Sequence, residues 1–447
     1  MQVVTLGRAE SQRGGKRVND LAGEVAGTTA LDQRVVSRRD RRQLGDLLAP
    51  QAGGTPPLPG RQPDVLGAEP GAPGSQQGAE FGRGRQMGAG PHPGNGSTRH
   101  SGLWIRVMEC PTVAGMEVSG MESRRLGDHG PLVSALGLGC MGMSQGYGEV
   151  DEREAIATID AALDAGVTLL DTAMSYGAGA NERLLAQVLR RRRDEVVLAT
   201  KFGIVRDADG THLDARPGRV RGFLDASLAR LRVDHVDLYY LHRVDPGVPV
   251  ADTVGAMADL VTEGKVAHLG VSETTAAELE QAVAVHPIAA LQLEWSLTWR
   301  ECEDEIVPAA RRLGVGIVPY SPLGRGLLTG TLTAAGAGQA PMRAQDPRFA
   351  GEALDQNLRL ADVVAQIAAE HQATPAQLAL AWLLAQGNDV VPIPGTRRQT
   401  RLSENLAALD LALSPGDLAR LERAVPRQAW AGNRSSFAAP LTERSAP

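Results

Sequence analysis

Four ionisable residues of complementary types stand at or just after the ends of three short apolar runs in the middle of the 447-residue chain. They are Asp171, Tyr176, Lys201 and His242. Short runs rich in leucine and β-branched residues predict buried strands. Parallel strands of an α/β barrel bring their C-terminal ends to one rim, where catalytic side chains lie. We therefore expect these four side chains to share one site.

The chemistry open to this set is proton transfer to a carbonyl oxygen. A buried lysine beside an aspartate stays charged, because the carboxylate offsets the desolvation of the ammonium. That ammonium should lower the pKa of the Tyr176 phenol from its usual value of about 10, which makes the phenol a general acid. A neutral His242 can orient the carbonyl. Carbonyl reduction also needs a hydride, which no side chain supplies, so a nicotinamide cofactor is implied.

Each of these residues alone has an ordinary structural explanation. A single lysine or aspartate at a strand end is more often half of an ion pair, and a tyrosine or histidine is usually packing or hydrogen bonding. Four suitable groups on three consecutive strand ends are less readily explained in this way. The alternative enzyme is a Schiff-base lyase that uses Lys201 as nucleophile. Asp171 argues against it, because a carboxylate would hold that lysine protonated.

The segments around these residues alternate between strand and helix patterns from residue 130 onward, which predicts an α/β fold of the (β/α)8 TIM-barrel class. Eight runs are expected as strands: 134–139, 167–171, 196–200, 236–241, 266–271, 289–293, 315–319 and 390–393. Helical patterns cover 152–165, 181–192, 219–231, 251–263, 275–284, 302–313, 355–386, 399–410 and 415–424. The longest segment without a strand or helix pattern is 321–352, and a loop of that length in a compact domain is usually functional.

The first 120 residues have a different composition. They hold 22 Gly and 10 Pro, or 32 of 120 positions, against 47 of 327 in the rest of the chain. We expect 1–120 to be a low-complexity, mostly disordered extension, 121–430 to be the barrel, and 431–447 to be a flexible tail. The arginine-rich stretch near residue 40 has acids interleaved, which transit peptides avoid. A start assigned upstream of Met121 and a functional extension are the two explanations for the first segment.

The charge and cysteine content exclude several classes of protein. The formal net charge of -6 argues against a protein that coats nucleic acid. No apolar run is long enough for a transmembrane helix, so no membrane partner is expected. Three widely spaced cysteines form neither a disulfide pattern nor a zinc pattern. We expect a cytoplasmic protein without a metal site.

The sequences of five segments resemble those of the aldo-keto reductase superfamily, and they occur in the same order. Together they span about 125–425, essentially the whole region expected to be ordered. The segments are LLDTAMSYG (169–177), ATKFG (199–203), DLYYLHRVDP (237–246), PYSPLGRGLLTG (319–330) and IPGTRRQTRLSEN (393–405). The resemblance implies a (β/α)8 barrel with NADP(H) across its C-terminal rim and a small-molecule carbonyl substrate. It implies that Tyr176 donates the proton, Lys201 and Asp171 tune it, and His242 orients the substrate. The branch of small monomeric reductases that includes pyridoxal and perakine reductases looks most similar, so we expect a monomer or a weak homo-oligomer.

The same resemblance implies a set of cofactor contacts. Gln292 matches the position that holds the nicotinamide carboxamide, and Tyr320 matches the aromatic that stacks on the nicotinamide ring. Arg397 and Arg401 suit a 2′-phosphate because guanidinium forks bind phosphate, which favours NADPH over NADH. Glu273 departs from the family, which often has asparagine there. The full set is Gly139, Cys140, Met141, Ser272, Gln292, Tyr320, Ser321, Leu323, Arg325, Gly395, Thr396, Arg397, Arg401, Glu404 and Asn405.

Two further interpretations are open. Residues 137–142 spell GxGxxG, but no helix pattern follows, which argues against a Rossmann dinucleotide site. Potassium-channel β subunits share the family fold and bind NADP(H) while regulating a partner, so a regulatory role is an alternative to catalysis.

The residues expected to line the substrate pocket indicate an apolar or aromatic aldehyde or ketone. They are Met143, Tyr147, Trp295, Trp299 and Phe349.

Overall fold

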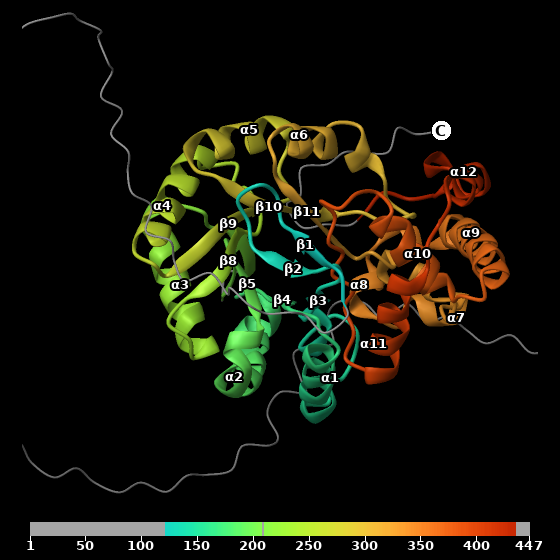
Figure 1. Ribbon diagram of the computed structural model, residues 1–447, viewed down its shortest axis with the longest axis horizontal. Helices are drawn as coiled ribbons and strands as arrows, with labels where there is room; N and C mark the ends of the chain where they lie inside the picture. The colour runs from blue at the N-terminus through green and yellow to red at the C-terminus, as the bar shows by residue number, and fades with distance from the viewer. Residues whose placement is uncertain (1–120, 208–209, 435–447) are drawn as a thin grey trace, which may run out of the picture. The chain divides into compact units, whose positions relative to one another are not determined.

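The computed structural model describes residues 121–207 and 210–434, and the predicted extension 1–120 lies outside them. Seven parallel strands form one sheet in the order β11-β10-β9-β8-β5-β4-β3, which curls into a barrel (Figure 1). This confirms the predicted barrel class. The strands are β3 (Leu138–Gly139), β4 (Leu169–Asp171), β5 (Val197–Phe202), β8 (Val236–Leu241), β9 (Val266–Ser272), β10 (Ile288–Glu294) and β11 (Gly316–Tyr320).

The eighth position of the barrel is occupied by an irregular segment where a strand was expected at 390–393. Val391 N donates to Ile317 O at 2.8 Å on the β11 side. On the other side, Gly137 N donates to the carbonyl oxygen of Pro392 at 3.0 Å. Pro392 and Pro394 have no N–H groups to donate toward β3. The segment therefore closes the barrel through single bridges instead of a regular ladder.

A hairpin covers the N-terminal end of the barrel. In it, β1 (Ser123–Arg125) pairs antiparallel with β2 (Leu132–Ser134). Asp128 N donates to Gly314 O at 2.8 Å, just before β11 begins. Leu126 is fully buried inside the ring of strands, where it packs with Val133 and with side chains of the barrel strands.

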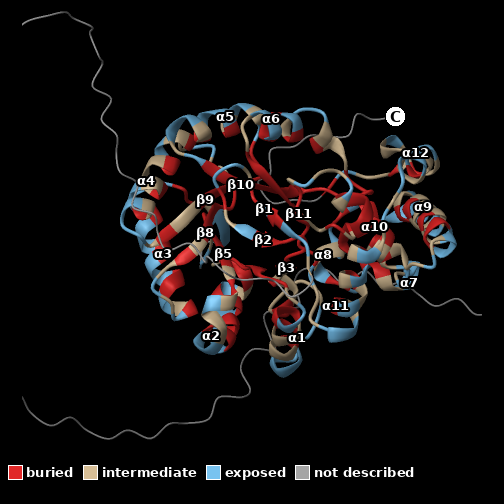
Figure 2. Ribbon diagram, viewed as in Figure 1, coloured by how far each residue is buried: buried red, intermediate tan, exposed pale blue. Residues whose placement is uncertain are grey.

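Helices form the outer layer, and most of them have a buried face turned inward and an exposed face turned outward (Figure 2). They are α1 (Glu152–Asp164), α2 (Ala180–Arg192), α3 (Pro217–Leu231), α4 (Val250–Thr262), α5 (Ala276–Val285), α6 (Ile306–Arg312), α9 (Gly351–Glu370), α10 (Pro375–Leu384), α11 (Gln399–Leu406) and α12 (Pro415–Ala424). Short 3-10 turns extend several of them, and they are η3 (Arg193–Glu195), η4 (Glu301–Glu303), η7 (Ala407–Asp410) and η8 (Arg427–Ala429).

The single helix predicted for 355–386 is wrong, because the structure has two helices there. Pro375 cannot continue a helix without losing a hydrogen bond, so it stands in the first turn of a new one. Thr374 and Gln377 form a reciprocal capping box at this start. Gln372, in the connection, has a positive φ of 55°. These local signals outweigh the continuous apolar pattern of the two helices.

The loops at the C-terminal ends of the strands carry structure that the sequence did not reveal. A hairpin of β6 (Ile204–Asp207) and β7 (Gly210–Leu213) follows β5 directly. The long interruption after β11 holds η5 (Gly324–Thr329), α7 (Ala334–Ala337), α8 (Pro341–Ala344) and η6 (Pro347–Phe349). The loops after β3 and β4 contain η1 (Met141–Met143) and η2 (Tyr176–Gly179). All four loops form walls of the cavity described below.

In the described ranges, no helix is both long and apolar enough to span a bilayer. Over the same residues, no group of three or more His, Cys, Asp or Glu side chains is arranged to hold a metal ion.

Candidate active site

The four predicted catalytic residues meet at the C-terminal rim of the barrel. Lys201 Nζ, at the end of β5, donates to Asp171 Oδ1 at 2.5 Å and to the Tyr176 hydroxyl at 3.1 Å. It also donates to the carbonyl oxygen of Thr172 at 2.8 Å. The Tyr176 and His242 rings lie edge to face with centroids 5.7 Å apart. All four side chains are buried, and Lys201 is not exposed at all.

The position of Tyr176 is set by an unusual turn after β4. Gly177, Ala178 and Gly179 all have positive φ, at 56°, 49° and 82°. Two glycines adopt this conformation without strain, whereas alanine rarely does. The Gln145 side chain, from the loop after β3, accepts a hydrogen bond from Gly177 N at 2.9 Å. Because of this turn, the Tyr176 phenol lies against Lys201 at the end of β5, and α2 begins only at Ala180.

The electrostatics of Lys201 agree with the sequence analysis, and those of Tyr176 correct it. Burial disfavours the charged lysine, but Asp171 and Tyr176 more than offset it, so the pKa of Lys201 is raised. Burial raises the pKa of Tyr176 above its ordinary value, and the opposing effect of Lys201 only reduces that rise. The expected net lowering is therefore wrong for the protein alone. A phenol with a raised pKa is fully protonated near neutral pH, as a proton donor must be.

His242 follows β8 and is neutral near neutral pH. Burial lowers its pKa well below the ordinary value, and the positive charges of Arg243, Lys201 and Arg206 lower it further. Its Nδ1 atom is buried and has no hydrogen-bond partner among the described residues. A neutral imidazole can donate one hydrogen bond to a carbonyl oxygen without competing as an acid.

A cavity of about 880 Å³ opens above these residues. Asp171, Tyr176 and His242 line it, and Asp171 is the one acidic residue among its described lining residues. Most of the predicted cofactor residues line it as well, and these are Gly139, Met141, Gln292, Tyr320, Ser321, Leu323, Arg325, Gly395, Thr396, Arg397 and Arg401. Gln292 Nε2 donates to Asp171 Oδ2 at 2.8 Å, which links the predicted carboxamide site to the tetrad.

Four predicted cofactor residues lie behind this wall. Cys140 is fully buried, and its pKa is raised by burial, so its thiol packs and is not a nucleophile. Ser272 is buried and accepts a hydrogen bond from Arg243 at 3.1 Å. Glu404 is ion-paired with Arg401 at 2.5 Å. Asn405 is buried on the same helix, α11.

The expected apolar substrate wall is wrong for four of its five residues. Tyr147 lines the cavity, but the other four are buried in the core and do not line it. Those four are Met143, Trp295, Trp299 and Phe349. Their place in loops misled the sequence analysis, because these loops fold back: Met143 and Trp295 pack in the main core, and Phe349 packs in a small cluster within the long loop and α9.

The charged lining residues that the sequence analysis missed are all arginines. Seven arginines of the described chain line the cavity, and Arg206, Arg243, Arg343 and Arg398 among them were not predicted. Arg397 donates to the carbonyl oxygen of Tyr147 at 3.1 Å. Arg206 comes from the β6–β7 hairpin, which follows Lys201 so closely that only the sequence Asp-Ala-Asp-Gly at 207–210 could have indicated it.

Arg325, predicted near the cofactor, belongs to a buried ionic network that joins residues of the long loop after β11 to Glu294. It lies 3.0 Å from Asp346 and 3.7 Å from Glu294, and Arg348 joins both carboxylates. Burial alone would raise the pKa of Glu294, but Arg348 and Arg325 lower it to about 2. The network fixes this loop against the end of β10.

Comparisons with known proteins agree with this geometry. Residues 135–426 match the model of the aldo/keto reductase family. A probable aldo-keto reductase 1 from Glycine max is 46% identical over 313 residues, which are 69% of this chain and 90% of the relative.

Solved structures are similar as well. A glycerol dehydrogenase from Gluconobacter oxydans has a TM-score of 0.64 at 27% identity, covering 70% of this chain and 98% of the other. An aldo-keto reductase from Klebsiella pneumoniae, solved in complex with NADPH, has a TM-score of 0.54 at 27% identity, covering 68% and 95%. With the barrel and the four residues at its rim, these matches establish that the chain belongs to the aldo/keto reductase family and is an oxidoreductase.

Proposed function

We propose that this protein reduces an aldehyde or ketone to an alcohol, reversibly, with NADPH as the hydride source and Tyr176 as the proton donor. The observation that carries the proposal is the contact of the Lys201 ammonium with both Asp171 and the Tyr176 hydroxyl on the cavity wall. A charged lysine there stabilises the phenolate that remains once the proton has left.

The residues around the cavity fit a nicotinamide dinucleotide phosphate. Their donor set is strongly cationic, in a chain whose net charge is negative. Arg397, Arg398 and Arg401 stand around the start of α11, whose N-terminus has no side-chain cap, so its N–H groups and dipole also favour a phosphate. When bound, the cofactor supplies a hydride. Gln292 and Tyr320 would hold its nicotinamide, and Arg397 and Arg401 its 2′-phosphate.

The chain's own residues account for the remaining requirements. The neutral His242 orients the carbonyl oxygen toward the Tyr176 hydroxyl, since both rings meet at the wall of the cavity. Tyr176 passes its proton to that oxygen as the carbonyl carbon is reduced. Lys201 stabilises the resulting phenolate, and Asp171 keeps Lys201 charged. In alcohol oxidation the phenolate accepts the proton instead.

The Schiff-base alternative has little support from this arrangement. Lys201 Nζ already makes three hydrogen bonds, and its pKa is raised, whereas a nucleophilic lysine needs a lowered pKa. Borohydride in the presence of an aldehyde should therefore trap no adduct on Lys201. A regulatory role like that of channel β subunits stays the alternative. The cytoplasmic location and a monomeric or weakly homo-oligomeric state stay predictions.

The test is consumption of NADPH against a panel of aldehydes that includes pyridoxal and nitrobenzaldehydes, with NADH in parallel. Turnover with NADPH that Tyr176→Phe abolishes supports the proposal. Tight NADPH binding with no turnover of any aldehyde would favour the regulatory role. Covalent trapping on Lys201 would favour the lyase.

A further inference from the structure

Glu273, the residue that departs from the family pattern, is the centre of a second buried network beside the cavity. It follows β9 directly, and its φ of 55° turns the side chain out of the strand direction. Its Oε1 accepts from the Tyr320 hydroxyl at 2.8 Å and from Glu294 N at 2.9 Å. Arg434 grips both carboxylate oxygens, at 2.7 and 2.5 Å.

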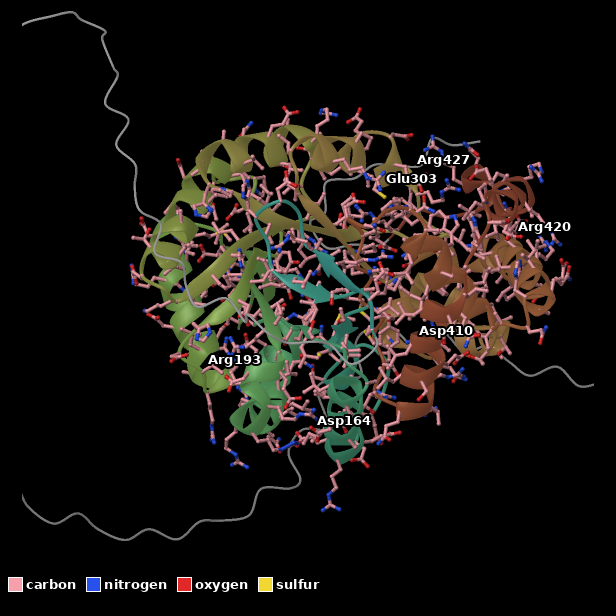
Figure 3. All side chains as sticks on the ribbon, in the orientation of Figure 1. Asp164, Arg193, Glu303, Asp410, Arg420 and Arg427 are labelled. Carbon is pink, nitrogen blue, oxygen red and sulfur yellow. The ribbon has the colours of Figure 1, made fainter. Side chains whose placement is uncertain are left out.

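Arg434 reaches this place because the chain after α12 is anchored at several points. Asn357 in α9 bonds both backbone groups of Ala431, with its amide donating at 2.9 Å and its oxygen accepting at 2.8 Å. Gly432 has a φ of 81°, and a Cβ there would come within 2.9 Å of the backbone of Arg348. Arg427, earlier in the same segment, makes a separate, exposed ion pair with Asp304 at 2.6 Å that is not one of these anchors; Figure 3 labels Arg427.

These anchors place the first four residues of the predicted C-terminal tail on the barrel. Trp430 just before them is buried, and the Arg434 guanidinium lies 5.2 Å from the centre of the Trp299 ring. Residues 435–447 of the predicted tail lie outside the described ranges. Residues 431–434, predicted as part of a flexible tail, thus place the charged side chain of Arg434 in the interior of the protein.

Both members of the Glu273–Arg434 pair are charged although both are buried. Burial opposes each charge, but each partner more than offsets it, so the pKa of Glu273 is lowered and that of Arg434 is raised. A buried carboxylate accepts short, strong hydrogen bonds from hydroxyl donors. The Tyr320 hydroxyl is one of those donors, so the orientation of its ring depends on the position of Glu273.

We propose that Glu273 and Arg434 are positioning residues, which together hold Tyr320 at the cavity wall in the orientation that receives the nicotinamide. Tyr320 itself sits at the end of β11, and the Arg243 guanidinium lies 5.9 Å from its ring centre. The Tyr320 ring is therefore held by residues at the ends of β8, β9 and β11 and by the C-terminal segment. The cofactor part of this inference rests on the proposed function.

The experiment uses the full chain labelled with fluorotyrosine and observed by fluorine NMR without cofactor. The chain has five tyrosines, and Tyr320→Phe assigns one resonance to Tyr320. Arg434→Met should shift that resonance, leave the other four in place, and raise the dissociation constant of NADPH about tenfold, the scale of one lost charged hydrogen bond. Arg427→Met is the matched control: it removes an arginine ion pair from the same segment and should change neither quantity.

Arg434→Met leaves Glu273 as an unpaired buried anion and could unfold the protein. The double variant Glu273→Met/Arg434→Met removes both charges, so it should unfold at nearly the wild-type temperature and still show the shifted Tyr320 resonance and the weaker NADPH binding. If a folded Arg434→Met variant, or this double variant, leaves the Tyr320 resonance in place, the inference is wrong. If the wild-type chain binds no NADPH, the proposed function fails, while the resonance still decides whether Glu273 and Arg434 position Tyr320.

Discussion

Among the tyrosines that line the cavity, Tyr176 and Tyr320 are each held by a buried ion pair, and the two pairs present opposite charges to them. Lys201, paired with Asp171, donates to the Tyr176 hydroxyl, whereas Glu273, paired with Arg434, accepts from the Tyr320 hydroxyl. Burial raises the pKa of both phenols. The nearby lysine opposes that rise at Tyr176, and the nearby glutamate adds to it at Tyr320.

The charge beside each phenol at the barrel rim determines whether that phenol can release its proton or is only held in place. A phenol beside a cation can release its proton because the phenolate is stabilised. A phenol that donates to an anion keeps its proton, and its ring is fixed instead. Tyr176 is thus suited to proton transfer, and Tyr320 is suited to stacking against a planar ring. The following predictions test this division.

The largest effect should come from removing the Tyr176 hydroxyl. Tyr176→Phe should lower kcat for carbonyl reduction by about 10²–10⁴-fold, the usual cost of losing a general acid. NADPH affinity, measured by fluorescence titration, should stay nearly unchanged because the ring remains. A variant that keeps about a tenth of wild-type turnover or more would show that another group donates the proton.

Removing the cation should separate the two directions of the reaction. Lys201→Met removes the charge that lowers the pKa of Tyr176, so that pKa should rise further. Alcohol oxidation needs the phenolate, so its rate should fall by about ten- to a hundredfold near neutral pH, the range for a hydrogen bond to a charged group. Its rise with pH should move to a higher pH, as initial rates across alkaline pH would show. An unmoved profile would place the titrating group elsewhere.

The arginines near α11 should act on affinity and not on proton transfer. The double change of Arg397 and Arg401 to Ala should weaken NADPH binding by more than about tenfold, because two charged hydrogen bonds are lost. NADH binding should barely change. Parallel titrations with both cofactors provide the check, and an equal loss for both would exclude these arginines as the 2′-phosphate site.

Removing the Tyr320 hydroxyl should have a smaller effect than removing that of Tyr176. Tyr320→Phe keeps the ring and leaves Glu273 paired with Arg434, so kcat should fall by only about two- to fivefold, the scale of one ordinary hydrogen bond. The shape of the pH profile should match the wild type, because Tyr320 does not titrate in the working range. Comparing full pH profiles of the two Phe variants tests this directly, and a profile changed as in Tyr176→Phe would end the proposed division.

The smallest effect is expected from the N-terminal segment. Both ion pairs and all barrel strands lie after residue 121, so a chain beginning at Met121 should keep wild-type kinetics and melting temperature. A chain beginning near residue 140 should fail to fold, since it lacks β3 and the closing hairpin. Loss of the melting transition in the Met121 chain would mean that the first 120 residues are part of the fold.

Much of the fold and the tetrad could be predicted because the information is local in the sequence. The period of apolar residues marks seven strands within a few residues, and the rule that strand ends meet at one rim brings Asp171, Tyr176, Lys201 and His242 together. The break before Pro375 was also encoded locally, in a proline and a capping box, and was missed because the apolar pattern continues across it.

Tertiary structure alone decided the charges and the walls of the site. The net pKa of Tyr176 depends on how completely its phenol is buried, which no spacing of residues reveals. Loop aromatics such as Trp299 and Phe349 turned into the core, because the path of a long loop depends on what packs beneath it. Glu273 looked like a departure from the family, and its role emerged only where Arg434, 161 positions away along the chain, folds back to pair with it. Sequence patterns report neighbours along a strand or helix, whereas a buried ion pair forms only where the folded chain brings two opposite charges close enough to offset the desolvation of both.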